Sequence, residues 1–277
     1  MTREINSVQL STGVELPYVE QGDQSGVPVV LLHAFLDSWR SFDGVLPHLP
    51  LSIHAFAVTQ RGHGDANRPD SGYGVEEFTA DLAAYMDALG IDAAVIVASS
   101  SAGFTARRFA AEHPQRALGI VLVGSPYSLG DKPAVAQFLD VVSALSDPID
   151  PAFVREFVES NMVRPVPPAF LEMLIAENLK VPARVWKATL AGLLDAVPTT
   201  DAGIAAPALI LWGDRDGFLP RSDQEALAAS IAGSRLVTYE GTGHVVHWEE
   251  PERTAVDIVA VANRWSGSAA REGWSSG

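Results

Sequence analysis

The stretch Ala93–Phe109, AAVIVASSSAGFTARRF, decides the fold of this 277-residue chain. Its first half is a continuous run of small and β-branched apolar residues, which is typical of a strand buried on both faces of a parallel sheet. Three serines follow, and a helical pattern then continues to Pro114. A serine on such a strand-to-helix turn holds its hydroxyl above the sheet, beside helix N–H groups that favour negative charge. We therefore predict a nucleophile at this turn.

The three serines compete for the tip of the turn, which requires small residues two positions before and two after it. Ser100 is flanked at these positions by two alanines, and Ser101 by a serine and Gly103. Ser99 has Val97 two positions before it, and a β-branched residue fits poorly there. The strand length and Gly103 favour Ser100, and Ser101 stays the alternative. A third possibility is a turn without chemistry, in which a serine only caps the helix.

Further apolar runs alternate with helical patterns and predict a mostly parallel, doubly wound α/β sheet. An alternating hairpin is expected over 5–10 and 14–21. The expected strands are Val27–Leu32, His54–Val58, Ala93–Ala98, Leu118–Val123, Ala208–Trp212 and Arg235–Tyr239. The expected helices are Val75–Leu89, Ser101–His113, Ser222–Ile231 and Pro251–Trp265.

The rhythm of strand and helix stops after the sixth strand. The following segment is rich in proline and has helical patterns over Val135–Leu145, Ala152–Ser160 and Pro168–Asn178. We interpret it as a helical cap over the carboxyl edge of the sheet, where ligands of open α/β sheets bind. The predicted division is a core of residues 1–126 and 207–266, a cap of residues 127–206, and a flexible tail of residues 267–277.

An acid and a base follow the serine in the chain order Ser, Asp, His that this type of site requires. Two carboxylates follow the strand Ala208–Trp212, and we prefer Asp216, which lies further out on the loop, to Asp214. His244, in the sequence EGTGH, is the expected base, because its glycines let the loop bend. His247 is better explained as a partly buried loop residue.

Ester hydrolysis places negative charge on the carbonyl oxygen, which two backbone N–H groups should stabilise. One donor is expected from Ser101, the residue after the nucleophile. The other is expected from Phe35, in the loop after the strand Val27–Leu32. The predicted substrate-binding side chains are apolar and include Phe35, Phe138, Phe157 and Trp186, from a wider set of cap candidates that adds Phe153, Met162, Phe170, Met173 and Leu174.

At this point the chain resembles the α/β-hydrolase superfamily, in the capped branch that holds small serine esterases, lactonases, carbon–carbon bond hydrolases, epoxide hydrolases and cofactor-free haloperoxidases. The matching segments are LLHAFLDSWRSF (31–42), TQRGHGDANRP (59–69), VASSSAGFTARRFAAEHP (97–114), LVGSP (122–126), LILWGDRDGFLP (209–220) and GTGHVVHWEEPE (241–252). The chain departs from the usual pattern with Ala34 after His33 and with alanines around Ser100. Epoxide hydrolases need a carboxylate at the position of Ser100, so the resemblance does not extend to their chemistry. Arg61 and His63 are expected to be structural.

The bulk composition limits the possible partners. A net charge of −15 disfavours nucleic acid and anionic membrane surfaces. The chain has no cysteine, and no histidine pair has metal-ligand spacing, so we expect no metal and no cofactor. The first residues show no secretion signal, so we expect a cytoplasmic protein. We also expect either a monomer or a homodimer.

Together these features predict a serine hydrolase that cleaves a carboxylic ester or lactone bond of a mostly apolar small molecule. Two alternatives remain. The same three residues also serve carbon–carbon bond hydrolysis, and some members of the superfamily are small-molecule receptors with weak turnover.

Overall fold

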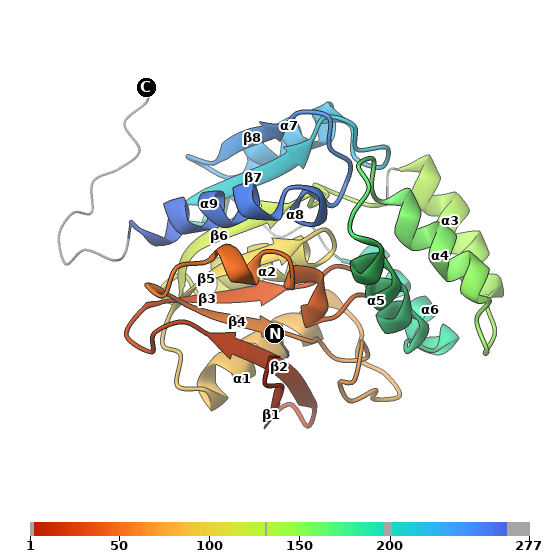
Figure 1. Ribbon diagram of the computed structural model, residues 1–277, viewed down its shortest axis with the longest axis horizontal. Helices are drawn as coiled ribbons and strands as arrows, with labels where there is room; N and C mark the ends of the chain where they lie inside the picture. Colours follow the sequence, from red (N-terminus) through yellow and green to blue (C-terminus); the bar gives the residue numbers. More distant parts are fainter. Residues whose placement is uncertain (1–2, 131, 197–200, 265–277) are drawn as a thin grey trace.

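An eight-stranded sheet forms the centre of the protein, as seen in a computed structural model that describes residues 3–130, 132–196 and 201–264 (Figure 1). The order of the strands is β1-β2-β4-β3-β5-β6-β7-β8. Strands β3 to β8 run parallel, whereas β2 is antiparallel to both β1 and β4. The bounds are β1 Asn6–Gln9, β2 Glu15–Gln21, β3 Val27–Leu32, β4 Ile53–Val58, β5 Ala94–Ser99, β6 Ala117–Val123, β7 Ala208–Gly213 and β8 Arg235–Tyr239.

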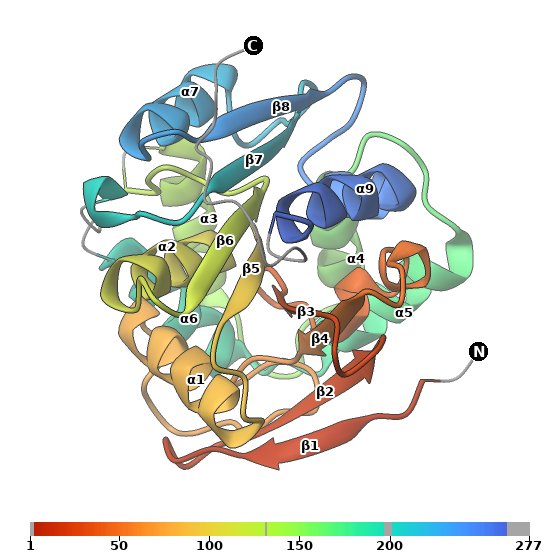
Figure 2. The same ribbon diagram turned by 90° about the vertical axis from the view of Figure 1, so that its left-hand side faces the viewer.

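Helices cover both faces of this sheet, because side chains alternate between the faces along each strand. On β5, Ile96 and Ala98 belong to one apolar core, while Val95 and Val97 belong to the other. The first core packs against α1, α2 and α7, and the second packs against α9 and the short helices after β3 (Figure 2). The bounds are α1 Val75–Ala88, α2 Ala102–Glu112, α7 Arg221–Ser230, α9 Pro251–Ala262, η1 Trp39–Phe42 and η2 Leu46–His48.

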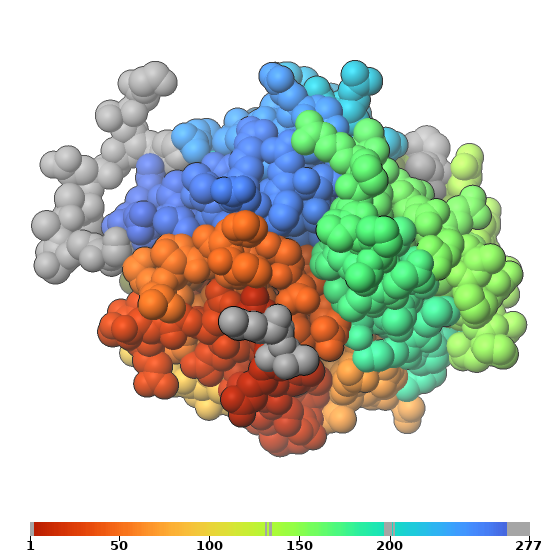
Figure 3. Space-filling model, viewed as in Figure 1, coloured from red at the N-terminus to blue at the C-terminus, as the bar shows by residue number. Residues whose placement is uncertain are grey.

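Four helices between β6 and β7 lie together at one end of the sheet, at the right of Figure 1. They share an apolar cluster that includes Val154, Leu174, Val185 and Trp186. Their bounds are α3 Pro133–Ala144, α4 Pro151–Ser160, α5 Pro168–Leu179 and α6 Ala183–Leu194. Figure 3 shows this group, mostly green, packed against the blue and orange segments of the core.

The prediction of an α/β-hydrolase fold with a helical insertion after the sixth strand is confirmed, and the predicted strands agree within one residue at each end. The sequence analysis missed α6, whose apolar residues were assigned to no helix, and also α8 (Val246–Glu249) and η3 (Asp201–Gly203). The exact division into core and cap stays a prediction. The tail 267–277 and the predicted end of the last helix at Trp265 lie outside the described residues. Within the described part of the chain, no helix has the length and apolarity that crossing a membrane requires.

Candidate active site

Ser100 lies at the tip of the turn between β5 and α2, in a backbone conformation that is rare for any residue other than glycine. Its φ is +47°, and its N–H donates to Val123 O at 2.8 Å. Such a conformation is strained and persists only where the surroundings enforce it. Gly103 accounts for the close packing here, because a Cβ at this position would lie 2.4 Å from Ser125 Oγ. The position that cannot hold a side chain is thus three residues after Ser100, whereas alanines fit at the positions two before and two after it.

A chain of hydrogen bonds joins Ser100, His244 and Asp216. His244 Nε2 lies 2.9 Å from Ser100 Oγ, and His244 Nδ1 lies 2.8 Å from Asp216 Oδ2. Asp216 Oδ1 also accepts the N–H groups of Phe218 and Leu219, at 2.8 and 2.9 Å. Since the carboxylate is an acceptor at both oxygens, the imidazole carries its proton on Nδ1, and Nε2 is free to accept the serine proton.

The alternatives to these three residues lie outside this chain of hydrogen bonds. Ser101 is the N-cap residue of α2, and its side chain makes no capping bond within the described residues. Asp214 Oδ1 accepts the Gly241 N–H at 2.6 Å, so it braces the loop that carries His244, as a short acidic residue in a turn can. His247 is fully buried, and burial lowers its pKa to about 3, with the nearby His244 adding to the effect.

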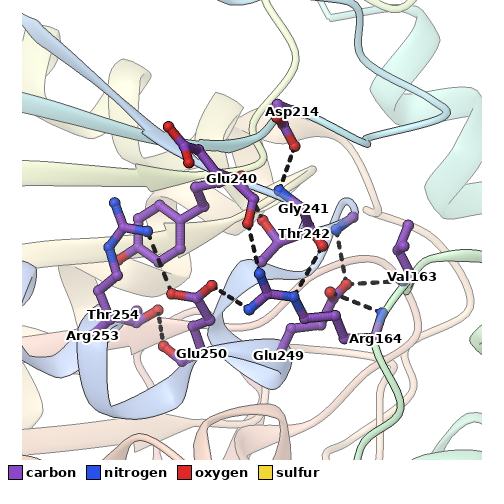
Figure 4. A network of polar contacts seen from close by, with 12 residues as sticks. Val163, Arg164, Asp214, Glu240, Gly241, Thr242, Glu249, Glu250, Arg253 and Thr254 are labelled. Atoms are coloured by element: carbon purple, nitrogen blue, oxygen red, sulfur yellow. Dashed lines mark hydrogen bonds and ion pairs between the residues drawn. The ribbon is translucent and has the colours of Figure 1, made fainter.

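The loop that carries His244 is held by the segment between α4 and α5 (Figure 4). The His244 N–H donates to Asn161 O at 3.0 Å. Glu249 accepts three backbone N–H groups, from Val163 and Arg164 at 3.0 Å and from Gly243 at 2.9 Å. One carboxylate therefore ties the helical insertion to the residue before the imidazole.

Arg164 strengthens the same junction. Its guanidinium donates to Gly241 O at 3.0 Å and Glu240 O at 2.7 Å, and it pairs with Glu250 at 2.5 Å (Figure 4). The side chains are partly exposed, so the ion pair itself contributes little. The two bonds to backbone carbonyls fix the loop directly, and the position of His244 thus depends on the insertion as well as on the core.

The predicted oxyanion donors, Phe35 and Ser101, both line the cavity above Ser100. Neither backbone N–H donates to a protein acceptor within the described residues. The loop of Phe35 is held from behind by His33, whose Nδ1 lies 2.7 Å from Ala34 O. His33 Nε2 accepts the Gln60 N–H at 2.9 Å, so this buried imidazole is neutral, and burial lowers its pKa well below the usual value.

The cavity has a volume of about 410 Å³ and lies between the carboxyl ends of the strands and the helical insertion. Ser100, Asp216 and His244 line it, together with Phe35, Phe138 and Phe157 from the predicted substrate-binding set. Further lining side chains, which the sequence analysis missed, are Leu129, Val135, Val158, Leu190, Leu193, Phe218 and Trp248. They come from separate loops and helices, and no periodicity distinguishes them from core residues.

The prediction that Trp186 binds substrate needs correction. The side chain is fully buried and does not line the cavity. Its ring packs edge-on against Phe35 and Phe157, with ring centres 5.8 and 5.4 Å apart, and its indole N–H donates to Val181 O. Trp186 thus supports two cavity rings from behind. The other cap candidates Phe153, Met162, Phe170, Met173 and Leu174 also lie outside the lining.

Arg61 and His63 have structural contacts. The Arg61 guanidinium binds Asp81 through two bonds, at 2.6 and 2.5 Å, and both side chains are buried. His63 Nδ1 lies 2.7 Å from Arg61 O, and burial lowers the His63 pKa to about 4. Among the described residues, no three His, Asp or Glu side chains are grouped so that they could hold a metal ion.

Asp37 is the site residue that the sequence analysis passed over. It is 3% exposed, lines the cavity, and accepts hydrogen bonds from Ser41 Oγ at 3.1 Å and from Asn178 Nδ2 at 3.2 Å. Burial raises the Asp37 pKa to about 7, more than the hydrogen bonds lower it. The available signal was an acidic residue two positions after Phe35, inside the loop expected to carry an oxyanion donor.

Glu249 gives a graded test of the junction. Glu249→Gln keeps an oxygen for only part of the three N–H donors, and Glu249→Ala removes every acceptor. Because each charge-assisted bond contributes about 1.5–3 kcal/mol, we expect amide exchange in residues 240–245 to accelerate at least about tenfold in the alanine variant. Hydrogen-exchange mass spectrometry measures this, with the exposed Glu252→Ala as the control. Unchanged exchange in the alanine variant would show that Glu249 does not hold the loop.

The raised pKa of Asp37 should make the stability of the folded protein depend on pH. Its pKa is raised on folding, so its contribution to stability is present below its unfolded pKa and is lost as the pH rises toward 7. Asp37→Asn removes this loss, and its stability advantage over the wild type should grow by about 2–3 kcal/mol between pH 5 and pH 8. Urea unfolding at both pH values measures the difference, with the exposed Asp92→Asn as control. An advantage that does not change with pH contradicts the raised pKa.

Comparisons with known proteins identify the family of this chain. Residues 29–258 match the model of the alpha/beta hydrolase family. A 2-hydroxy-6-oxo-2,4-heptadienoate hydrolase of Pseudomonas putida is 28% identical over 265 residues, which are 89% of this chain and 92% of the relative. An esterase from Exiguobacterium antarcticum superposes with a TM-score of 0.83 at 20% identity, over 93% of this chain and 99% of its own. The enol-lactonase from Burkholderia xenovorans superposes with a TM-score of 0.76 at 20% identity, over 93% and 100% of the two chains. At such identities the structural matches show the shared fold, and the family match over most of the chain establishes that this protein belongs to the alpha/beta hydrolase family.

Proposed function

We propose that this protein is a serine hydrolase that cleaves a carboxylic ester or a lactone. The hydrogen-bond chain from Ser100 through His244 to Asp216 is the observation that carries the proposal. Ser100 Oγ attacks the carbonyl carbon while His244 Nε2 takes the hydroxyl proton. Asp216 holds the imidazole in the required tautomer and stabilises the imidazolium that forms.

The negative charge on the carbonyl oxygen is received by the N–H groups of Phe35 and Ser101, two residues of the cavity lining whose N–H groups have no protein acceptor among the described residues. His244 then gives its proton to the leaving alkoxide, and the acyl group stays on Ser100. A water molecule, deprotonated by His244, attacks this ester and releases the acid. In a lactone, both products remain one molecule, a hydroxy acid.

A mostly apolar substrate fits the lining of the cavity. Phe138 and Phe157 stack with ring centres 5.5 Å apart, and Phe35 meets both edge-on at 6.3 Å. Burial of apolar substrate surface against these rings supplies most of the binding energy in a pocket of this kind. An esterase and an enol-lactonase are among the proteins that share this fold, which is consistent with this class of substrate.

A carbon–carbon bond hydrolase is the second candidate. The Pseudomonas putida relative bears the name of a hydrolase of a dienoate, and it matches nearly the whole chain. The same three residues serve either bond, so a panel of aryl esters, lactones and vinylogous diketones distinguishes the candidates by which compounds are turned over. A receptor with weak turnover would bind such compounds without releasing product.

The nucleophile is tested by labelling with a fluorophosphonate. The wild type should form one adduct, and Ser100→Ala should form none, with ester turnover reduced by about 10⁴-fold or more. Ser101→Ala is the matched control, because it removes the neighbouring hydroxyl and keeps the backbone N–H; it should keep the label. A label that survives in Ser100→Ala moves the nucleophile to Ser101. An unlabelled wild type that is folded by circular dichroism contradicts the proposal.

A further inference from the structure

Asp37 is the second carboxylate of the cavity, and the backbone is strained to place it there. Within the described residues, Leu36 and Ser100 are the non-glycine residues with positive φ, and the φ of Leu36 is +71°. The turn is closed by the Asp37 N–H, which donates to Ala34 O at 3.3 Å. Strain of this kind concentrates at functional positions. Ser100 has a function in the proposed mechanism, whereas the strained residue before Asp37 has none yet.

The groups around Asp37 are oriented so that they donate hydrogen bonds to its carboxylate. The Trp248 indole N–H donates to Ser41 Oγ at 2.8 Å, and His247 Nε2 lies 3.0 Å from the same oxygen. His247 Nδ1 is buried and has no hydrogen-bond partner among the described residues, so the tautomer that avoids an unpaired N–H carries its proton on Nε2. Ser41 then accepts two bonds and directs its own proton to Asp37, and Asn178 donates from the other side.

Asp37 has fewer partners than Asp216, the other carboxylate in the cavity. Asp216 accepts two backbone N–H groups and the imidazole N–H. Asp37 accepts two neutral donors at the long distances of 3.1 and 3.2 Å and forms no ion pair with a described residue. An ionised carboxylate has about four acceptor positions. Asp37 therefore has unused capacity on a side that faces the substrate cavity.

Two other polar side chains of the cavity wall, Ser160 and Asn161, donate to the backbone of the insertion. Asn161 Nδ2 and Ser160 Oγ both donate to Phe157 O, at 2.7 and 2.8 Å. Each of these two donors is thus engaged by a carbonyl of the insertion, and neither residue is a carboxylate. Asp37 is the buried carboxylate of the wall that lacks a full set of donors within the described part of the chain.

We infer that Asp37 forms a polar subsite that accepts a hydrogen bond from the substrate, and that it selects esters or lactones that carry a hydroxyl or amide N–H besides the reacting carbonyl. This inference rests on the proposed hydrolase function and narrows its substrate class. The donor of the substrate supplies the third hydrogen bond to Asp37, while the rest of the substrate lies against the apolar wall. A donor-free substrate leaves a desolvated carboxylate under-satisfied, which costs binding energy.

The charges around Asp37 give the subsite a pH dependence. Glu177 of α5 faces it with like charge and is itself paired with Arg40 of η1 and Lys180, while His244 faces it across the cavity. His247, from α8, is neutral at ordinary pH. Burial raises the Asp37 pKa to about 7, so the accepting carboxylate form increases as the pH rises through this value. Selection for a donor should increase in the same direction.

The test compares matched esters. On the acyl side, the probes are p-nitrophenyl hexanoate and its 2-hydroxy, 3-hydroxy and 6-hydroxy derivatives. On the alcohol side, they are propyl hexanoate and the monohexanoate of propane-1,3-diol. For each pair we measure the ratio of kcat/KM, hydroxylated over parent, which cancels effects common to both substrates. At least one hydroxylated probe should be preferred by the wild type, and Asp37→Asn should lower that ratio by about 10-fold, as expected for a lost charged hydrogen bond.

Glu177→Gln is the matched control, because Glu177 does not line the cavity but raises the Asp37 pKa. The Glu177→Gln variant should keep the preference for the hydroxylated probe, and this preference should begin to increase at a lower pH than in the wild type. Ratios that are equal in wild type and Asp37→Asn at every probe overturn the inference and leave the hydrolase proposal intact. A ratio that falls as pH rises also overturns it, because Asp37 would then donate. If neither member of any pair is turned over and no fluorophosphonate label forms, the hydrolase proposal itself fails.

Discussion

The left-handed backbone at Ser100 is the constraint on which the site depends. A residue with a side chain in this conformation is held by its neighbours, and here β5 lies between β3 and β6 in the middle of the sheet. The Ser100 N–H donates to Val123 O, at the end of β6. Gly103 lets α2 lie close to Ser125, which follows β6. A central strand of the sheet thus leads directly to the residue that we propose as nucleophile.

The proposed base is held in a different way. His244 is on a loop after the edge strand β8, where the sheet alone offers little support. The helical insertion supplies further support, because Asn161 O accepts the His244 N–H, and the N–H groups of Val163 and Arg164 donate to the Glu249 carboxylate that also binds Gly243. The insertion therefore has two roles. It forms the apolar wall of the cavity, and it helps to fix the imidazole at hydrogen-bond distance from Ser100.

Much of the fold could be predicted from the sequence, because buried parallel strands are continuous apolar runs and differ clearly from amphipathic helices. Ser100, Asp216 and His244 could be proposed because each follows a predicted strand, and the carboxyl ends of parallel strands meet at one edge. The substrate wall could not be predicted equally well. Trp186 and Phe157 are both large apolar residues of the insertion, and only their packing shows that one supports the wall while the other forms it.

Asp37 illustrates a second limit. Its surroundings come from η1, α5 and α8, which are far apart in the chain, and a sequence alone does not indicate that Ser41, Asn178 and Trp248 meet. The packing of these elements also changes the pKa of Asp37. A carboxylate on a loop would ordinarily be solvated, whereas burial here raises its pKa to about 7. Physical properties of this kind depend on tertiary packing and become visible only in the structure.

The central claim is that Ser100 becomes acylated during turnover. The most direct measurement is rapid-quench mass spectrometry with p-nitrophenyl hexanoate, followed by peptide mapping of the acylated residue. We expect a transient mass increase of one hexanoyl group, located on Ser100, and its absence in His244→Ala, in which no base activates the hydroxyl. Turnover of the ester with the acyl group on Ser101, or with no acylated serine at all, would contradict the claim.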